Sequence, residues 1–133
     1  MTTNPVDRFL DAVTAGTGVP TDLYADGALL DATVPSWRLE AHGPAAISAQ
    51  LSGWFADPAV LSELQRTPVP GGEVVRFSLA WQEQGLPMAA HQVHVLVLSD
   101  GRITRQDVWC GGRWDAALQA EIESGLQAAR GQA

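Results

Sequence analysis

The dipeptide Asp100-Gly101 separates two stretches of alternating residues, 88–98 and 102–110, and it limits the possible folds more than any other feature. Asp-Gly tolerates the positive φ angles of a type I′ turn, so the two stretches are predicted to form a tight β-hairpin. With Asp100 and Gly101 as the loop residues, Ser99 lies opposite Arg102. This turn therefore predicts the register of the whole hairpin.

The predicted register pairs residues along both strands, and three pairs matter for function: His94 with Asp107, Val93 with Val108, and His91 with Cys110. His91 and His94 are three positions apart, an odd number. Because side chains alternate along a strand, the two histidines are expected on opposite faces of the sheet. A zinc site that uses both is therefore disfavoured, and no metal is expected.

Extending the alternation to the preceding strand gives two faces of different character. One face carries many large apolar side chains and must pack against helices or another subunit. We expect a homodimer through this face, with Trp81, His94, Asp107 and Trp109 at the interface. The other face carries small and β-branched residues that suit the lining of a cavity. It includes Arg76, His91, Val93, Gln106, Val108 and Cys110.

The rest of the chain alternates between helix and strand patterns. Thr3 or Asn4 is predicted to cap a first helix that has Pro5 in its first turn, with Val6, Phe9, Leu10 and Val13 on one stripe and Gly16 and Gly18 at its end. The other predicted elements are a short helix over 20–26, a strand ended by Pro35, a helix that starts near Pro44 and ends at Asp57-Pro58, strands over 60–67 and 73–83, and a helix over 113–130. Helices beside an antiparallel sheet predict an α+β fold.

Composition narrows the class of protein. At 133 residues the chain is expected to form one domain, 1–133. Its net charge of −7 makes nucleic acid a poor partner, and its eight basic residues are all arginine, which excludes Schiff-base lysine chemistry. A single cysteine fits a reducing cytosol. Neither a membrane span nor a secretory signal is expected.

Three segments, "LYADGALLDATVP", "GPAAISAQLSGWFADP" and "VLVLSDGRITRQDVWC", resemble the SnoaL-like branch of the nuclear transport factor two-like superfamily over nearly the whole chain. The resemblance implies a cone: a bent sheet around a long helix, open at one end onto an apolar pocket, and often dimeric. Members include steroid isomerases, limonene epoxide hydrolase, polyketide cyclases and many non-enzymes. The epoxide hydrolase residues fall near Arg76, Ser78 and Val108, of which only the arginine is kept. The isomerase base falls at Asp31 or its neighbour Ala32.

These considerations lead to one functional hypothesis and one alternative. The hypothesis is a cofactor-independent isomerase, cyclase or dehydratase that acts by proton transfer on a small apolar organic molecule. Asp31 is the candidate base, with its pKa raised by burial, and His91 is the candidate proton shuttle. The candidate ligand-binding residues are Trp37, Arg76, Val93, Gln106, Val108 and Cys110. The alternative is a non-catalytic ligand-binding or dimeric interaction module, in which Asp31 caps a turn and His91 and Cys110 simply pack.

Overall fold

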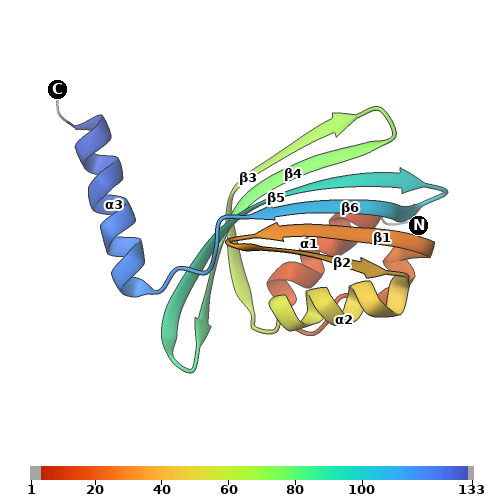
Figure 1. The fold of residues 1–133 in the computed structure, drawn as a ribbon, viewed down its shortest axis with the longest axis horizontal. Helices are drawn as coiled ribbons and strands as arrows, with labels where there is room; N and C mark the ends of the chain where they lie inside the picture. Colours follow the sequence, from red (N-terminus) through yellow and green to blue (C-terminus); the bar gives the residue numbers. More distant parts are fainter. Residues whose placement is uncertain (1–3, 132–133) are drawn as a thin grey trace.

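A computed structural model describes residues 4–131 of the chain. These residues form three α-helices, one short 3₁₀ helix and one sheet, and the sheet is curved (Figure 1). The helices are α1 (Pro5–Ala15), α2 (Pro44–Trp54) and α3 (Ala116–Arg130), with a short 3₁₀ helix η1 (Thr21–Leu23). The strands are β1 (Tyr24–Val34), β2 (Trp37–His42), β3 (Ala59–Val69), β4 (Gly72–Glu83), β5 (Leu86–Ser99) and β6 (Arg102–Cys110).

The six strands form one sheet in the order β2-β1-β6-β5-β4-β3. Only β1 and β6 run parallel; the other neighbours are antiparallel. Helices α1 and α2 lie against one side of the bent sheet (Figure 1). This inner side holds the core, where buried side chains of the sheet meet those of α1 and α2. The predicted α+β cone is confirmed.

The first helix begins as its sequence predicts. The side chain of Asn4 accepts a hydrogen bond of 2.7 Å from the backbone of Val6, while Thr3, the other predicted cap, lies outside the described residues. The predicted stripe is buried in the core. Gly16 ends the helix with φ of 69°, and a Cβ there would lie 2.3 Å from the backbone of Asp57. Only glycine satisfies both conditions.

The hairpin turn is confirmed, but the register beyond it is wrong by one residue. Asp100 and Gly101 both have positive φ, and Ser99 pairs with Arg102. The pairing then shifts, because Thr104 is looped out of β6 as a β-bulge. From this point on, each β6 residue pairs one position away from its predicted partner: Cys110 lies opposite Gln92, Val108 opposite His94, and Asp107 opposite Val95.

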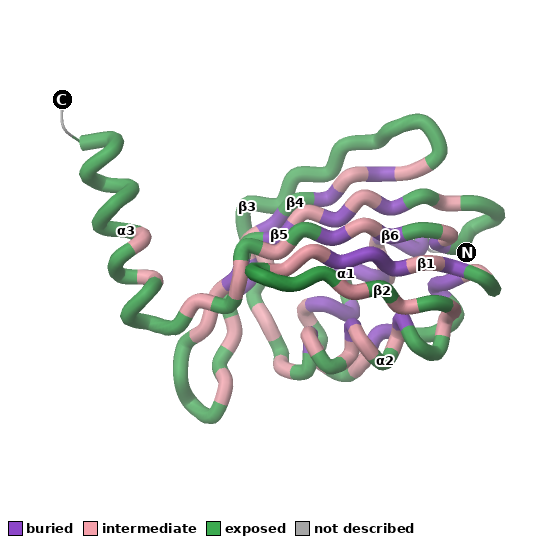
Figure 2. Tube along the Cα trace, viewed as in Figure 1, coloured by how far each residue is buried: buried purple, intermediate pink, exposed green. Residues whose placement is uncertain are grey.

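The bulge exchanges the two faces of β6. Gln106 and Val108 are buried on the inner side, while Arg105, Asp107 and Trp109 lie on the outer side. On β5 the separation of the two histidines is confirmed: His94 is fully buried and His91 is exposed. The face expected to line a cavity is, on β4 and β5, the outer one. The large apolar face packs against the helices, which is one of the two partners expected for it. Figure 2 shows buried residues alternating with more exposed ones along the strands.

Two local predictions near the N-terminal half are also wrong. The short helix predicted over 20–26 is only the single turn of η1, because β1 already begins at Tyr24. The segment after Pro35, for which no helix or strand was predicted, is strand β2, which pairs with β1 in a tight hairpin where Val34 lies opposite Trp37. This hairpin brings residues of β2 next to Asp31.

The C-terminal helix begins later than predicted, at Ala116, with Asp115 as its cap. It projects away from the sheet (Figure 1), and none of its residues is buried. Not one of the helices between residues 4 and 131 combines the length and apolar character that a membrane crossing requires.

Candidate functional site

A cavity of about 500 Å³ opens at the end of the cone, between the C-terminal end of α2, the β1–β2 turn and the β4–β5 hairpin. Its apolar wall includes Trp54, Phe55, Leu79 and Trp81. The polar side chains that line it are Asp57, Glu83, Gln92, Cys110 and Arg113. An apolar cavity with few polar groups is the usual form of a small-molecule site.

At the rim, one carboxylate is engaged by neighbouring side chains. Glu83 accepts a 2.9 Å hydrogen bond from the indole of Trp81 and forms an ion pair with Arg113. The guanidinium of Arg113 also lies 6.0 Å from the centre of the Trp81 ring. Asp57, in contrast, has no side-chain hydrogen bond to any residue of the described range. Of the two carboxylates, Asp57 is therefore the one available to a ligand.

A chain of buried polar side chains leads from the core to this cavity. The hydroxyl of Tyr24 lies 2.7 Å from Oε1 of Gln106, and Nε2 of Gln106 lies 2.9 Å from Nδ1 of His94. Nε2 of His94 lies 2.8 Å from Oε1 of Gln92. Nε2 of Gln92 then lies 3.6 Å from the sulfur of Cys110. The last two residues of the chain, Gln92 and Cys110, line the cavity.

His94 is neutral in this chain. Its ring stacks on Phe77 with 5.4 Å between ring centres and also contacts Phe9 and Phe55. Burial among these rings lowers the pKa of His94 to about 3, and burial likewise raises the pKa of Tyr24 above its ordinary value. Both groups therefore stay uncharged near neutral pH and act as hydrogen-bonding groups.

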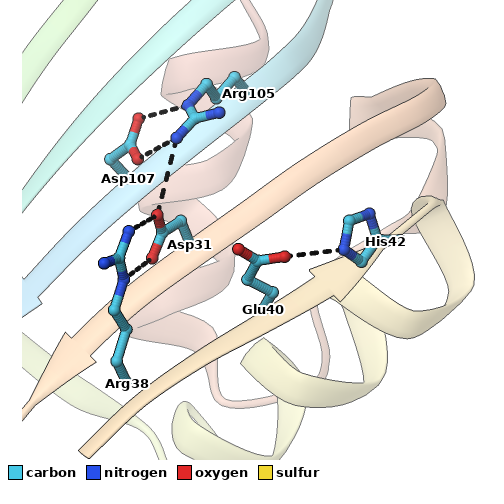
Figure 3. Close-up of polar contacts among 6 residues, drawn as sticks. All are labelled: Asp31, Arg38, Glu40, His42, Arg105 and Asp107. Atoms are coloured by element: carbon cyan, nitrogen blue, oxygen red, sulfur yellow. Dashed lines mark hydrogen bonds and ion pairs between the residues drawn. The ribbon is translucent and has the colours of Figure 1, made fainter.

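Asp31, the predicted base, lies on the outer face of the sheet and away from the cavity. Figure 3 shows it in a cluster of charged side chains from β1, β2 and β6. Arg38 donates two hydrogen bonds to its carboxylate, and Arg105 lies 3.6 Å away while it also binds Asp107. The hydrogen bonds from Arg38 are the main reason that the pKa of Asp31 is lowered. The expected rise of its pKa is wrong, because β2 supplies an arginine that the expectation did not include.

His91, the predicted proton shuttle, is also on the outer face. It lies opposite Ser78 on β4, and its Nε2 is 3.3 Å from a carboxylate oxygen of Glu63. More than half of its side chain is exposed. Its predicted position inside a pocket is wrong because the face of β4 and β5 that carries it is the outer one, and the β6 bulge separates it from Cys110 by pairing that residue with Gln92.

The residues predicted to bind a ligand are dispersed over the molecule. Arg76 and Val93 face each other on the outer side, and Val108 is a core residue. Trp37, at the β1–β2 turn, is 70 % exposed and lies outside the cavity lining. Gln106 belongs to the buried chain, one layer below the cavity. Of the eight predicted site residues, the cavity lining includes only Cys110.

The predicted dimer interface is divided in the same way. Asp107 and Trp109 lie on the outer face, whereas Trp81 lines the cavity and His94 is buried beneath it. These four residues therefore cannot form one surface. Within residues 4–131, no three histidine, cysteine or acidic side chains are close enough together to hold a metal ion.

Comparison with known proteins gives matches in structure and none in sequence. No family model matches the chain, and no curated protein is similar to it. An NTF2-like protein of unknown function from Mesorhizobium loti superimposes with a TM-score of 0.62 at 20% identity, over 81% of this chain and 88% of its own. The chain has a nuclear transport factor two-like fold. A proposed isomerase from Rhodopseudomonas palustris (TM-score 0.60, 17% identity, 83% of this chain and 91% of its own) has the same fold. A proposed polyketide cyclase from Sinorhizobium meliloti also has this fold, with a TM-score of 0.57 and 20% identity over 80% of this chain and 94% of its own.

Sequence patterns alone did not indicate most of the cavity residues. Gln92 and Trp81 belong to the face that was expected to be covered by helices or a second subunit. The sequence does hold one sign of the bulge. Ile103 and Val108 are both apolar but five positions apart, an odd spacing that a regular strand with one buried face does not produce.

Proposed function

We propose that this chain binds a small, largely apolar organic molecule in the cavity at the open end of the cone. The observation that carries the proposal is the cavity itself, because its volume of about 500 Å³ and its aromatic wall suit a ligand of one to three rings. Trp54 and Trp81 offer flat apolar surfaces, and tryptophan side chains favour flat organic ligands.

The cavity also supports a catalytic form of this proposal. Isomerisation, cyclisation or dehydration by proton transfer requires a base and a donor that polarises the reacting oxygen. Asp57 is a carboxylate in the lining, and Gln92 is an amide in the same lining. Two proteins with the same fold are proposed as an isomerase and a polyketide cyclase, which favours this class of reaction. In this form of the proposal, Asp57 takes the role that the sequence suggested for Asp31.

Binding can be tested with acetylnaphthalene as a probe of suitable size and shape. Titration followed by ¹⁵N–¹H NMR should give saturable shifts for residues that line the cavity, such as Gly112 and Ala90, and none for Ala80 on the outer face. Saturable shifts confined to the outer face would overturn the proposal. Wild-type spectra that do not change at millimolar probe would overturn it as well.

Catalysis is separated from binding by exchange of protons with deuterated solvent. A protein that abstracts a proton next to the carbonyl should accelerate deuterium incorporation into the methyl group of acetylnaphthalene, and Asp57→Asn should remove the acceleration while binding remains. Asp26→Asn, which changes an exposed carboxylate outside the cavity lining, is the control. Binding without exchange would leave the non-catalytic form of the proposal.

Two further expectations remain predictions of the proposal. The single cysteine favours a reducing compartment such as the cytosol. Self-association through the sheet would now involve the outer face, with Trp109, and would leave the cavity free in both copies.

A further inference from the structure

The buried chain of side chains from Tyr24 to Gln92 has a direction that can be worked out from its members. Tyr24 is almost completely buried, and within residues 4–131 the only hydrogen-bond partner of its hydroxyl is the side chain of Gln106. A buried hydroxyl hydrogen without an acceptor is costly, so Tyr24 must donate to Oε1 of Gln106. That bond fixes the orientation of the Gln106 amide.

The remaining bonds follow in order. With its oxygen occupied, Gln106 directs its amide nitrogen to Nδ1 of His94, which must then accept. A neutral imidazole has one acceptor and one donor nitrogen, so Nε2 of His94 carries the hydrogen and donates it to Oε1 of Gln92. The amide nitrogen of Gln92 is thereby turned towards Cys110 and the cavity.

The reverse direction of this hydrogen-bonded chain can be excluded by matching donors to acceptors in the same way. If both amides and the imidazole were turned round, Gln106 would donate to the Tyr24 oxygen, and the hydroxyl hydrogen of Tyr24 would have no acceptor among the described residues. Each other bond would still form. The hydroxyl of Tyr24, deep in the core, is thus the group that decides which end of the Gln92 amide faces the cavity.

We infer that the Gln92 amide presents N–H donors to the cavity and selects ligands that carry a carbonyl or enolate oxygen over apolar molecules of the same shape. The nitrogen has two hydrogens, and its partner within the protein is sulfur, a weak acceptor. A ligand oxygen is a better acceptor than the thiol. Tyr24, Gln106 and His94 act as positioning residues, since they reach the ligand only through Gln92.

This inference rests on the proposed function, because it specifies the ligand of the same cavity. It also limits the role of His94. Amide groups orient hydrogen bonds but do not exchange their protons readily, so the chain holds the Gln92 donor in place and does not conduct protons.

Two probes of the same shape test the inference. Acetylnaphthalene and isopropenylnaphthalene, substituted at the same ring carbon, differ only in that the first has a carbonyl oxygen where the second has a methylene group. The measured quantity is the ratio of the dissociation constant of the hydrocarbon to that of the ketone. Comparing this ratio between variants cancels the different hydration of the two probes.

The ratio should fall about tenfold in Gln92→Met, which keeps the size of the side chain but removes the donor. Tyr24→Phe should lower it in the same direction, although residue 24 is not in the cavity lining, because the chain loses the group that sets its direction. Leu79→Met, an apolar exchange in the lining, should alter both affinities alike and leave the ratio unchanged. If Gln92→Met does not fold, the side-chain amide signal of Gln92 in the wild type decides: the ketone should shift it downfield, and the hydrocarbon should not.

The outcomes separate the two proposals. Saturable binding of both probes, with an equal ratio in wild type and Gln92→Met or no selective shift of the Gln92 signal, would overturn the inference and leave the binding cavity intact. An unchanged ratio in Tyr24→Phe would overturn the role of Tyr24. Failure of both probes to bind the wild type would overturn the proposed function and this inference with it.

Discussion

Arg38 holds the carboxylate of Asp31 with two hydrogen bonds, 2.9 Å from Nε to Oδ1 and 2.6 Å from Nη2 to Oδ2. The two residues belong to β2 and β1, so the pair joins the strands of the hairpin. Only 8 % of the Asp31 side chain is exposed, whereas Arg38 reaches it from solvent. Bidentate bonds of this kind are among the stronger ion pairs in proteins.

Replacement of Asp31 by asparagine should lower the free energy of unfolding in a pH-dependent way. The pKa of Asp31 is lowered in the folded protein, so the stability that it contributes is fully present above its unfolded pKa of about 4 and is lost as the pH falls below that value. Urea unfolding should show a constant difference between wild type and Asp31→Asn above pH ~5 and a shrinking one towards pH ~3. Asp26→Asn, at an exposed site, should show no such convergence; a difference for Asp31→Asn that does not change with pH would contradict the assignment.

Replacement of His94 by glutamine should remove a pH dependence of a different origin. The pKa of His94 is about 3 in the folded state, but about 6.5 in the unfolded chain. Between these values the unfolded state binds more protons, so wild-type stability is highest above pH ~6.5 and decreases by about 1.4 kcal/mol for each pH unit below it. Glutamine offers one donor and one acceptor but does not titrate, so the slope should be reduced in His94→Gln.

The control for this prediction is His91→Gln, which replaces an exposed histidine on the same strand. Chemical unfolding between pH ~4.5 and ~7, where most carboxylates remain charged, gives both slopes. If His94→Gln retains the wild-type slope, the histidine is not buried as the structure shows.

Gly16→Ala should be destabilising by about 1–3 kcal/mol, because the residue has positive φ and the new methyl group would collide with the backbone of Asp57. The matched control is Gly125→Ala in α3, where no atom lies within 4 Å of the added carbon and helix propensity favours alanine. Thermal unfolding should place the first variant below the wild type and the second at or above it. Equal unfolding midpoints for the wild type and Gly16→Ala would contradict the prediction and show that the backbone at Asp57 can move aside at little energetic cost.

Deletion of α3 should leave the rest of the protein folded. No residue of this helix is buried, and among the described residues one hydrogen bond joins its side chains to a strand, the 3.3 Å bond that Gln119 donates to the backbone carbonyl of Pro87. A chain that ends at Asp115 keeps the bridge between Trp114 and Ala89. Its unfolding free energy should differ from that of the full chain by no more than about 1 kcal/mol. If the truncated chain no longer unfolded cooperatively, the expectation would be wrong, and α3 would be needed to stabilise the rest of the fold.

Much of the fold could be predicted from local signals. Pro5 and Pro44, the glycines after the first helix and the Asp100-Gly101 turn each specify a conformation that depends on few neighbours, and the elements around them were confirmed. The missed strand β2 does alternate, with Arg38, Glu40 and His42 between apolar residues, but it is only six residues long and none of its residues is buried, so it is a weak signal beside the longer strands. Its pairing depends on β1, which the sequence shows only in part.

The side of the sheet that each β6 residue faces could not be predicted, because it depends on one unpaired residue, Thr104. Trp109, large and apolar, is six positions from Ile103, and this even spacing hides the bulge that the odd spacing to Val108 indicates. Without the bulge Val108 would lie on the polar outer side, and with the bulge Trp109 does. The choice is made by parallel pairing with β1, where Leu30 aligns with Gln106 and Ala32 with Val108, and this contact spans more than seventy residues of chain.

The looped-out Thr104 has a consequence for anyone who compares this chain with others of similar shape. An alignment of β6 that starts from the Asp100-Gly101 turn and one that starts from the end of β6 differ by one residue. A related strand without the extra residue would place the counterpart of Asp107 among the core side chains and that of Gln106 in solvent. Catalytic assignments carried between such proteins along β6 therefore hold only after the loop has been located in each.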